Sequence, residues 1–239
     1  MTPIVTLVPV LEDNYSYILQ SGDAVAIVDP GDANPIINKL NEMGITPTHI
    51  LNTHHHGDHI QGNKALREKY NCVLIGPLHE TKRIADMDIT YGDQDFFNLG
   101  DDKVLVIETP GHTTGHICFY LPDSHILFSG DLLFALGCGR AFEGTAQDLF
   151  HSIAKIKDLP KQTRIYCGHE YTAANAVFAL TVEPDNKALI ARSEEIKKLH
   201  AAGTPTIPTT LEYEWQTNPF IRAKTADHFS KIRHLKDNF

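Results

Sequence analysis

The sequence lacks any long hydrophobic run, and this absence limits the kinds of protein that it can encode. No stretch of about 18 or more apolar residues occurs, which is the length that a membrane-spanning helix requires. The N-terminus also lacks a charged segment followed by an apolar one, so we expect no secretory signal and a cytoplasmic location. With 42% hydrophobic and 21% charged residues, the chain has the composition of an ordinary globular protein with no membrane partner.

Cysteine and basic charge are scarce as well. The four cysteines form no Cys-x-x-Cys pair, so we interpret them as small buried hydrophobes rather than as a disulfide scaffold. The formal net charge of −9 argues against nucleic acid as a partner. The acidic excess lies in residues 1–170, whereas residues 219–239 carry more basic than acidic side chains.

Hydrophobic periodicity predicts a mixture of strands and helices up to residue 170 and mostly helices after it. Strand patterns cover 4–9, 15–20, 24–28, 49–52, 73–75, 96–99, 103–108, 117–121, 126–128 and 164–167. Helical spacing covers 34–43, 60–70, 145–158, 171–181, 186–202 and about 223–236. Residues 132–144 hold three glycines without a clear period, which predicts a loop. We therefore expect an α+β protein with two domains, residues 1–170 and 171–239.

Histidine is frequent, with 14 residues, and its densest cluster follows a predicted buried strand. His54 and His56 lie two residues apart, so in an extended segment their side chains point to the same side, whereas His55 points away. Asp58 and His59 follow at the expected start of a helix. Asp58 alone could be a helix N-cap. Four potential ligands within six residues instead favour a divalent metal such as Zn²⁺.

Three further positions each follow a predicted strand in a turn that contains glycine. They are His112, Asp131 and His169. Sites collect on loops at strand ends, although His112 or His169 alone is equally typical of an ordinary turn, and Asp131 alone is more typical of one. With the first cluster they make seven potential ligands, which is too many for one tetrahedral metal. The set suits two metals that share one carboxylate.

These residues belong to four short motifs: Thr-His-His-His-Gly-Asp-His at 53–59, Gly-His-Thr-Thr-Gly-His at 111–116, Ser-Gly-Asp at 129–131 and Gly-His-Glu-Tyr at 168–171. Together the motifs resemble the metallo-β-lactamase superfamily. A Gly-Cys-Gly loop at 137–139 and an Arg-x-x-Lys-Asp pattern at 233–237 narrow the resemblance to the glyoxalase II (hydroxyacylglutathione hydrolase) family. The similarity extends over essentially the whole chain.

The resemblance implies a fold and a ligand set. The fold would be a four-layer αββα sandwich followed by a smaller helical domain that completes the substrate pocket. One metal would be held by His54, His56 and His112, a second by Asp58, His59 and His169, and Asp131 would bridge them. Zn²⁺ is the expected ion, with iron or manganese as alternatives, because His/Asp sites accept all three.

The implied activity is hydrolysis of S-(2-hydroxyacyl)glutathione thioesters, usually S-D-lactoylglutathione to D-lactate and glutathione, the second step of methylglyoxal detoxification. A hydroxide between the two metals would attack the carbonyl carbon, with Asp58 and Asp131 as catalytic carboxylates. The leaving thiolate needs no general acid, because a thiol has a pKa of only about 8.5. Cys138 is interpreted as a loop residue rather than a nucleophile.

The same resemblance implies that Arg140, Tyr171, Arg233 and Lys236 bind the glutathione moiety of a small-molecule substrate. Arg233 and Lys236 would share one face of the last predicted helix. The chain departs from some family members, which have lysine at the position of Arg140 and tyrosine at the position of Phe142. Phe142 lacks the hydroxyl and is left out of the predicted site. The chain is expected to be a monomer.

Three other functions remain as alternatives. A glutathione-persulfide dioxygenase on the same scaffold needs one redox-active iron, whereas the two metal sites and the Arg-x-x-Lys ending favour the hydrolase. A β-lactamase fits Asp58, His59 and the helical C-terminal region poorly. A non-catalytic metal-binding protein would bind metal and turn over no thioester.

Overall fold

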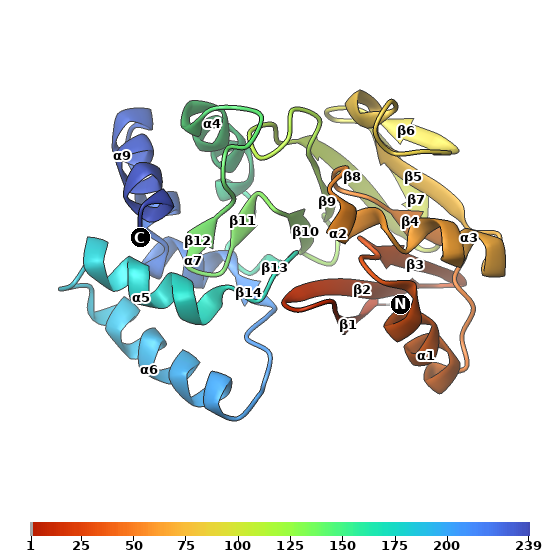
Figure 1. Cartoon of the computed structure of the whole chain (residues 1–239), viewed down its shortest axis with the longest axis horizontal. Helices are drawn as coiled ribbons and strands as arrows, with labels where there is room; N and C mark the ends of the chain where they lie inside the picture. The colour runs from red at the N-terminus through yellow and green to blue at the C-terminus, as the bar shows by residue number, and fades with distance from the viewer. Residues whose placement is uncertain (1) are drawn as a thin grey trace. The chain divides into compact units, whose positions relative to one another are not determined.

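The computed structural model describes residues 2–239, which group into two compact units (Figure 1). Unit 1 holds the residues up to Glu108 and Gly115–Gly130, and unit 2 holds Thr109–Thr114 and Asp131–Phe239. The chain therefore enters unit 2 briefly, returns to unit 1, and then completes unit 2. The predicted domain boundary after residue 170 remains a proposal, and Met1, with which the first predicted domain begins, lies outside the described residues.

Unit 1 contains a sheet whose six strands follow chain order. They are β1 (Ile4–Val10), β2 (Asn14–Ser21), β3 (Ala24–Val28), β4 (His49–Leu51), β5 (Val73–Pro77) and β6 (Ile89–Tyr91). The first three pair antiparallel and the rest parallel. Parallel neighbours need crossover connections, and these carry α1 (Ala33–Met43), α2 (Gly57–Ile60), α3 (Asn63–Tyr70) and the 3-10 turn η1 (Leu78–Glu80).

A second group of strands in unit 1 is antiparallel throughout. It consists of β7 (Phe96–Leu99), β8 (Asp102–Glu108), β9 (Ile117–Leu121) and β10 (Ile126–Gly130), each paired with the next. The ring of Tyr17 on β2 lies 5.6 Å from that of Phe128 on β10, measured between centroids. The two groups of strands therefore pack face to face around buried aromatic rings.

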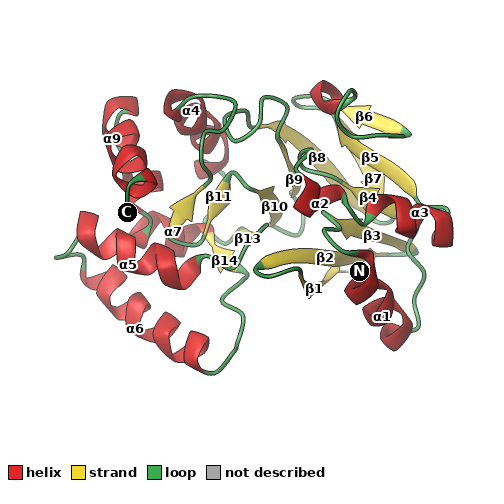
Figure 2. Cartoon of the chain, in the orientation of Figure 1, coloured by secondary structure: helices red, strands yellow, loops and turns green. Residues whose placement is uncertain are grey.

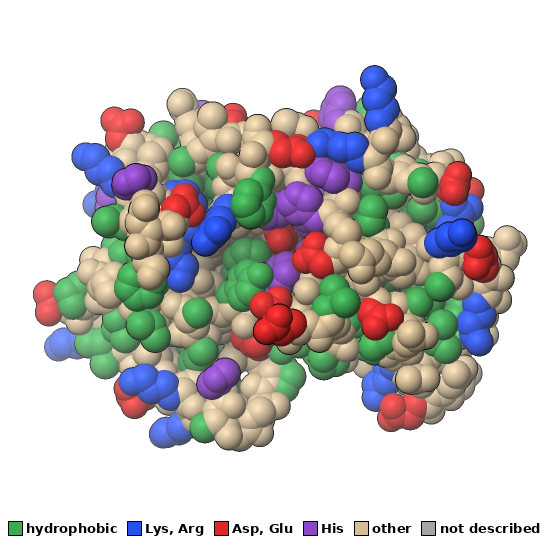
Figure 3. Space-filling view, viewed as in Figure 1, with side chains coloured by type: hydrophobic (Ala, Val, Ile, Leu, Met, Phe, Trp, Pro, Cys, Tyr) green, Lys and Arg blue, Asp and Glu red, His purple; other side chains and the backbone are tan. Residues whose placement is uncertain are grey.

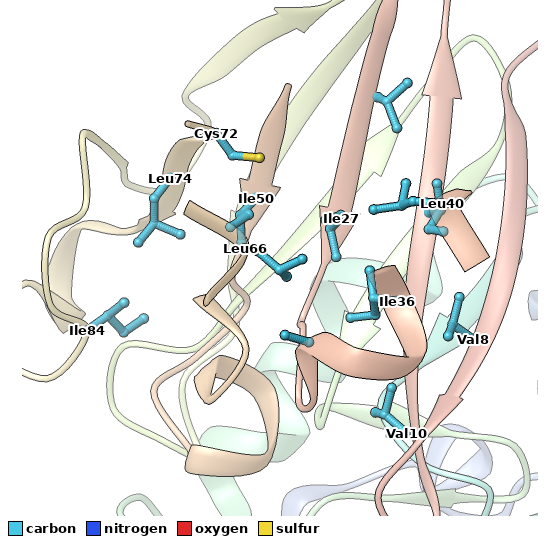
Figure 4. Close-up of a cluster of buried hydrophobic side chains, with 13 residues drawn as sticks. Val8, Val10, Ile27, Ile36, Leu40, Ile50, Leu66, Cys72, Leu74 and Ile84 are labelled. Atoms are coloured by element: carbon cyan, nitrogen blue, oxygen red, sulfur yellow. The ribbon is translucent and has the colours of Figure 1, made fainter. Parts of the chain in front are cut away.

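The helices of unit 1 cover the outer face of its six-stranded sheet. Helix α1 begins at its N-cap Asp32 and ends at Gly44, which has a φ of 66°. Its Ile36 and Leu40 are fully buried in one cluster with Ile27 of β3 (Figure 4). Burying each such side chain contributes about 1.5–3 kcal/mol. The outer faces of α1 and α3 carry acidic and basic side chains next to one another (Figure 3), so both helices are amphipathic.

Unit 2 is mainly helical (Figure 2). Its helices are α4 (Ala146–Lys157), α5 (Thr172–Val182), α6 (Lys187–Ala201), α7 (Leu211–Thr217), α8 (Pro219–Arg222) and α9 (Ala226–Asp237). Its short strands pair antiparallel. β11 (Leu133–Phe134) and β12 (Gly137–Cys138) form a hairpin, and β13 (Arg164–Cys167) pairs with β14 (Thr209–Thr210), which follows α6. The ring of Phe220 contacts those of Phe178 and Phe229, which joins α8 to α5 and α9.

The structure corrects the predicted loop at 132–144, which contains the β11–β12 hairpin. Strands of two residues are too short for a hydrophobic period, and distant side chains hold this hairpin. Glu214 accepts the Leu136 N–H at 2.8 Å, and the Asn218 amide donates to the carbonyls of Phe134 and Gly137 at 3.2 and 3.0 Å. These contacts span many residues along the chain, so local periodicity does not reveal them.

The predicted helix at 60–70 is interrupted, because α2 ends at Ile60 and α3 begins at Asn63. The N–H of Gly62 donates to the Pro30 carbonyl at 2.8 Å, and a Cβ at Gly62 would lie 2.7 Å from that oxygen. The short elements β6, β14, α7 and α8 were also absent from the prediction.

Among the described residues, no helix combines the length and the apolar character needed to cross a membrane.

Candidate functional site

The histidine cluster of unit 1 begins at His54, three residues after the end of β4. The Nε2 of His54 lies 3.2 Å from the Nδ1 of His56, so the two rings face a common point. The ring of His59 lies 4.2 Å from that of His54, centroid to centroid. His55 turns elsewhere, with its Nδ1 3.2 Å from the buried carboxylate of Glu80. The imidazole rings of three of the four predicted ligands in this segment, His54, His56 and His59, therefore lie next to one another.

Asp58 lies in the first turn of α2, whose N-cap is His56, so Asp58 does not cap the helix. Its Oδ2 accepts a hydrogen bond from the Asn14 amide at 2.8 Å and lies 3.6 Å from the Nε2 of His59. The carboxylate of Asp58 and the imidazole of His59 thus lie side by side, as two ligands of one ion would.

Asp29, which the sequence analysis did not select, anchors this segment. Its carboxylate accepts hydrogen bonds from the Thr53 N–H at 2.8 Å and the Thr53 hydroxyl at 2.7 Å, and it lies 3.1 Å from the Nδ1 of His59. Asp29 is buried and has a φ of 48°. The available signal was its place at the end of β3, which pairs directly with β4. A carboxylate on Nδ1 leaves the Nε2 of His59 for a metal.

In unit 2, Asp131 lies between two predicted histidine ligands. Its Oδ2 lies 3.3 Å from the Nε2 of His112 and 3.3 Å from the Nε2 of His169, and all three residues are buried. The Nδ1 of His112 forms a 2.9 Å hydrogen bond with the Arg140 carbonyl. This bond makes Nδ1 the protonated nitrogen and leaves Nε2 as the ligand. The His169 ring stacks on Tyr171 at 4.6 Å with an angle of 5°.

A cavity of about 410 Å³ opens beside Asp131 in unit 2, a size that suits a small molecule. It brings together all four predicted substrate-binding residues: Arg140, Tyr171, Arg233 and Lys236. Phe134, Phe142 and Cys138 also line it. Burial lowers the pKa of Lys236, and the nearby Arg233 and Arg140 lower it further. Burial and neighbouring positive charges disfavour the charged form of this lysine, and an anion that binds beside it would stabilise that form.

Each unit thus carries a donor set that fits divalent metals. Imidazole nitrogens and carboxylate oxygens are the ligands that zinc, iron and manganese share. Unit 1 supplies His54, His56, Asp58 and His59, and unit 2 supplies His112, Asp131 and His169. No cysteine is among them, and all four cysteines are reduced and buried.

Known proteins resemble the chain over its entire length. Residues 10–169 match the family model of the metallo-beta-lactamase superfamily, and residues 170–239 match that of the hydroxyacylglutathione hydrolase C-terminus. A hydroxyacylglutathione hydrolase of Pelagibacter ubique is 43% identical, covering 98% of this chain and 99% of its own. One of Rhizobium etli is 46% identical, covering 95% of both chains. Among solved structures, the B3 metallo-beta-lactamase BLEG-1 superposes with a TM-score of 0.71 at 26% identity, covering 92% of this chain and 100% of that one.

Proposed function

Because the chain belongs to the metallo-β-lactamase superfamily and, within it, to the hydroxyacylglutathione hydrolases, we propose that it hydrolyses S-(2-hydroxyacyl)glutathione thioesters. The usual substrate is S-D-lactoylglutathione, which gives D-lactate and glutathione in the second step of methylglyoxal detoxification. The resemblance and the α+β αββα fold predicted from the sequence are confirmed. One observation carries the substrate assignment, namely the cavity in which Arg140, Arg233 and Lys236 line the space beside Asp131.

We propose two metal ions with the ligand sets expected from the sequence. His54, His56 and His112 would hold one ion, Asp58, His59 and His169 would hold the other, and Asp131 would be shared by both. The support within unit 2 is that Asp131 lies at 3.3 Å from one histidine of each set, as a bridging carboxylate requires. Zn²⁺ is proposed, with iron or manganese as alternatives. When bound, the ions supply a hydroxide near neutral pH and polarise the thioester carbonyl.

The chain's own side chains and carbonyl groups bind the substrate and orient the proposed metal ligands. The carboxylates of glutathione are anionic, so Arg140 and Lys236 attract them, while the rings of Phe134 and Tyr171 line the cavity. The Arg140 carbonyl and the Asp29 carboxylate hold His112 and His59 in their ligand orientations. The departing glutathione thiolate needs no proton donor because its pKa is close to neutral, about 8.5.

A direct test is to count the metals in the purified chain and to assay a panel of substrates. We expect two ions per chain and hydrolysis of S-D-lactoylglutathione that a chelator abolishes and zinc restores. If the chain instead binds one iron and consumes oxygen with glutathione persulfide as substrate, the function is that of a dioxygenase rather than a hydrolase. Hydrolysis of a β-lactam alone would indicate a lactamase, and bound metal without turnover would indicate a binding protein.

We also propose a cytoplasmic location. The four cysteines of the chain are reduced and buried, and the reducing cytosol keeps both such thiols and glutathione reduced. Cell fractionation followed by the lactoylglutathione assay tests this assignment. The expectation of a monomer stays a prediction, which light scattering on the purified chain checks.

A further inference from the structure

Arg233 on α9 is committed to contacts inside the protein. It is only 4% exposed, although it lines the cavity of unit 2. Its Nη1 donates to the Cys138 carbonyl at 2.9 Å and approaches the Gly139 carbonyl at 3.5 Å. Its Nε and Nη2 both lie 3.0 Å from Oδ1 of Asp237, and its guanidinium lies over the Phe220 ring. The planar guanidinium therefore joins α9 to the end of β12.

The segment that Arg233 holds lies directly against two proposed metal ligands. A Cβ at Gly139 would lie 1.9 Å from the Asp131 carbonyl oxygen and 3.3 Å from the Nδ1 of His112, so only glycine permits this approach. The Gly139 N–H donates to the Leu132 carbonyl at 3.1 Å. One residue later, the Arg140 carbonyl forms the hydrogen bond with His112. Any shift of residues 138–140 is therefore transmitted to His112 and Asp131.

We propose that Arg233 is a positioning residue, which fixes residues 138–140 and through them the orientation of His112 and Asp131. This role rests on the proposed function only for the identity of the metal ligands. It goes beyond the binding of glutathione, because it makes a residue of the last helix control the metal centre.

Lys236, three residues further along α9, behaves differently. It is half-buried, and its ammonium lies over the rings of Phe178 and Phe239. The described contacts tie it to no backbone carbonyl of residues 138–140. The two basic residues of one helix face thus have different roles. Lys236 attracts the anionic substrate, and Arg233 holds residues 138–140 in place.

The decisive variant is Arg233→Lys, which keeps the positive charge but loses the planar fork that reaches a carbonyl and a carboxylate together. We expect its zinc affinity, measured on the metal-free protein by competition with a chelator, to fall about tenfold, as for other groups that orient metal ligands. We expect kcat to fall by about the same factor. Lys236→Met should instead raise KM and leave kcat and zinc affinity unchanged.

Arg222→Lys is the matched control. Arg222 on α8 pairs with Glu183 at the surface, so the same substitution there should leave zinc affinity, kcat and KM unchanged. The proposal is overturned if Arg233→Lys raises KM alone and keeps wild-type zinc affinity and kcat, because Arg233 would then act only on the substrate.

If Arg233→Lys does not fold, a second variant still tests the proposal. Asp237→Ala removes the oxygen that accepts from Arg233 at a half-exposed position. Reduced zinc affinity in this variant supports the positioning role, and unchanged affinity overturns it. If the wild-type chain binds zinc but hydrolyses no glutathione thioester, the proposed function fails. The zinc affinities of the variants still decide the role of Arg233 in that case.

Discussion

The candidate metal ligands of unit 1 and unit 2 are held in place by two different means. In unit 1 they lie in one short segment, and a single buried carboxylate, Asp29, reaches both ends of it through Thr53 and His59. In unit 2 they come from three separate segments, and backbone groups around Gly139 fix His112 and Asp131. One side chain can orient ligands that lie in a short segment. The orientation of ligands from separate segments depends instead on how closely the backbones of those segments pack. The two halves should therefore fail in response to different substitutions.

Removal of the shared carboxylate should have the largest effect. Asp131→Ala deletes the oxygen that lies 3.3 Å from both His112 and His169. We expect hydrolysis of S-D-lactoylglutathione to fall by at least about a hundredfold, with fewer than two metals retained. Steady-state kinetics and metal analysis check both numbers. Turnover like that of the wild type would refute the bridging role.

Asp29→Asn should break the unit 1 anchor alone. The amide keeps the bulk of the carboxylate but has only one accepting oxygen. It therefore cannot serve both the Thr53 N–H, which bonds Oδ1, and the Thr53 hydroxyl with His59, which lie on Oδ2. We expect metal affinity or activity to fall by about 10–100-fold, measured by chelator competition. Asp32→Asn is the matched control, since Asp32 caps α1 and asparagine caps a helix equally well. Equal behaviour of the two variants would mean that Asp29 does not orient His59.

Gly139→Ala should break the unit 2 arrangement through crowding. The new Cβ would lie 1.9 Å from the Asp131 carbonyl oxygen, so the backbone must shift, at a cost of about 1–3 kcal/mol. We expect zinc affinity to fall along with the free energy of unfolding, as followed by urea denaturation. At Gly92 a Cβ would meet side-chain atoms rather than backbone, the nearest being the Glu108 carboxylate oxygen at 3.3 Å. Gly92→Ala should therefore be tolerated, and similar losses in both variants would argue against a special role of Gly139.

The smallest effect is expected at the start of α4, which follows the turn beside His112. Thr145 and Asp148 form a capping box, and Thr145→Ala should cost about 1 kcal/mol without loss of metal. Hydrogen bonds from Thr145 lower the pKa of Asp148. The resulting stability is present above the ordinary carboxyl pKa of about 4 and is lost as pH falls through the lowered pKa. Urea unfolding at pH 7 and in acid should show a weaker pH dependence in Thr145→Ala, whereas an unchanged dependence would exclude this source.

Prediction from the sequence succeeded where the evidence is local. The cluster at His54–His59 is readable because its members are consecutive and follow a strand, and the family motifs extended it to the whole chain. Asp29 was missed because its importance arises from the pairing of Val28 with Leu51, which brings the ends of two strands together. Spacing predicted that Arg233 and Lys236 share a helix face, but it could not reveal that the Arg233 guanidinium is buried against Cys138. Burial depends on the packing of helices that are distant in sequence.

The burial of Cys138 bears on what happens after the reaction. The product is itself a thiol, and a reactive thiolate in the cavity could exchange with glutathione disulfide and block the enzyme covalently. Cys138 lines that cavity, yet burial raises its pKa to about 11 in spite of the nearby Arg233. At neutral pH the sulfur therefore stays protonated and unreactive. Glutathione disulfide can therefore meet Cys138 in this cavity without exchanging with it to a mixed disulfide.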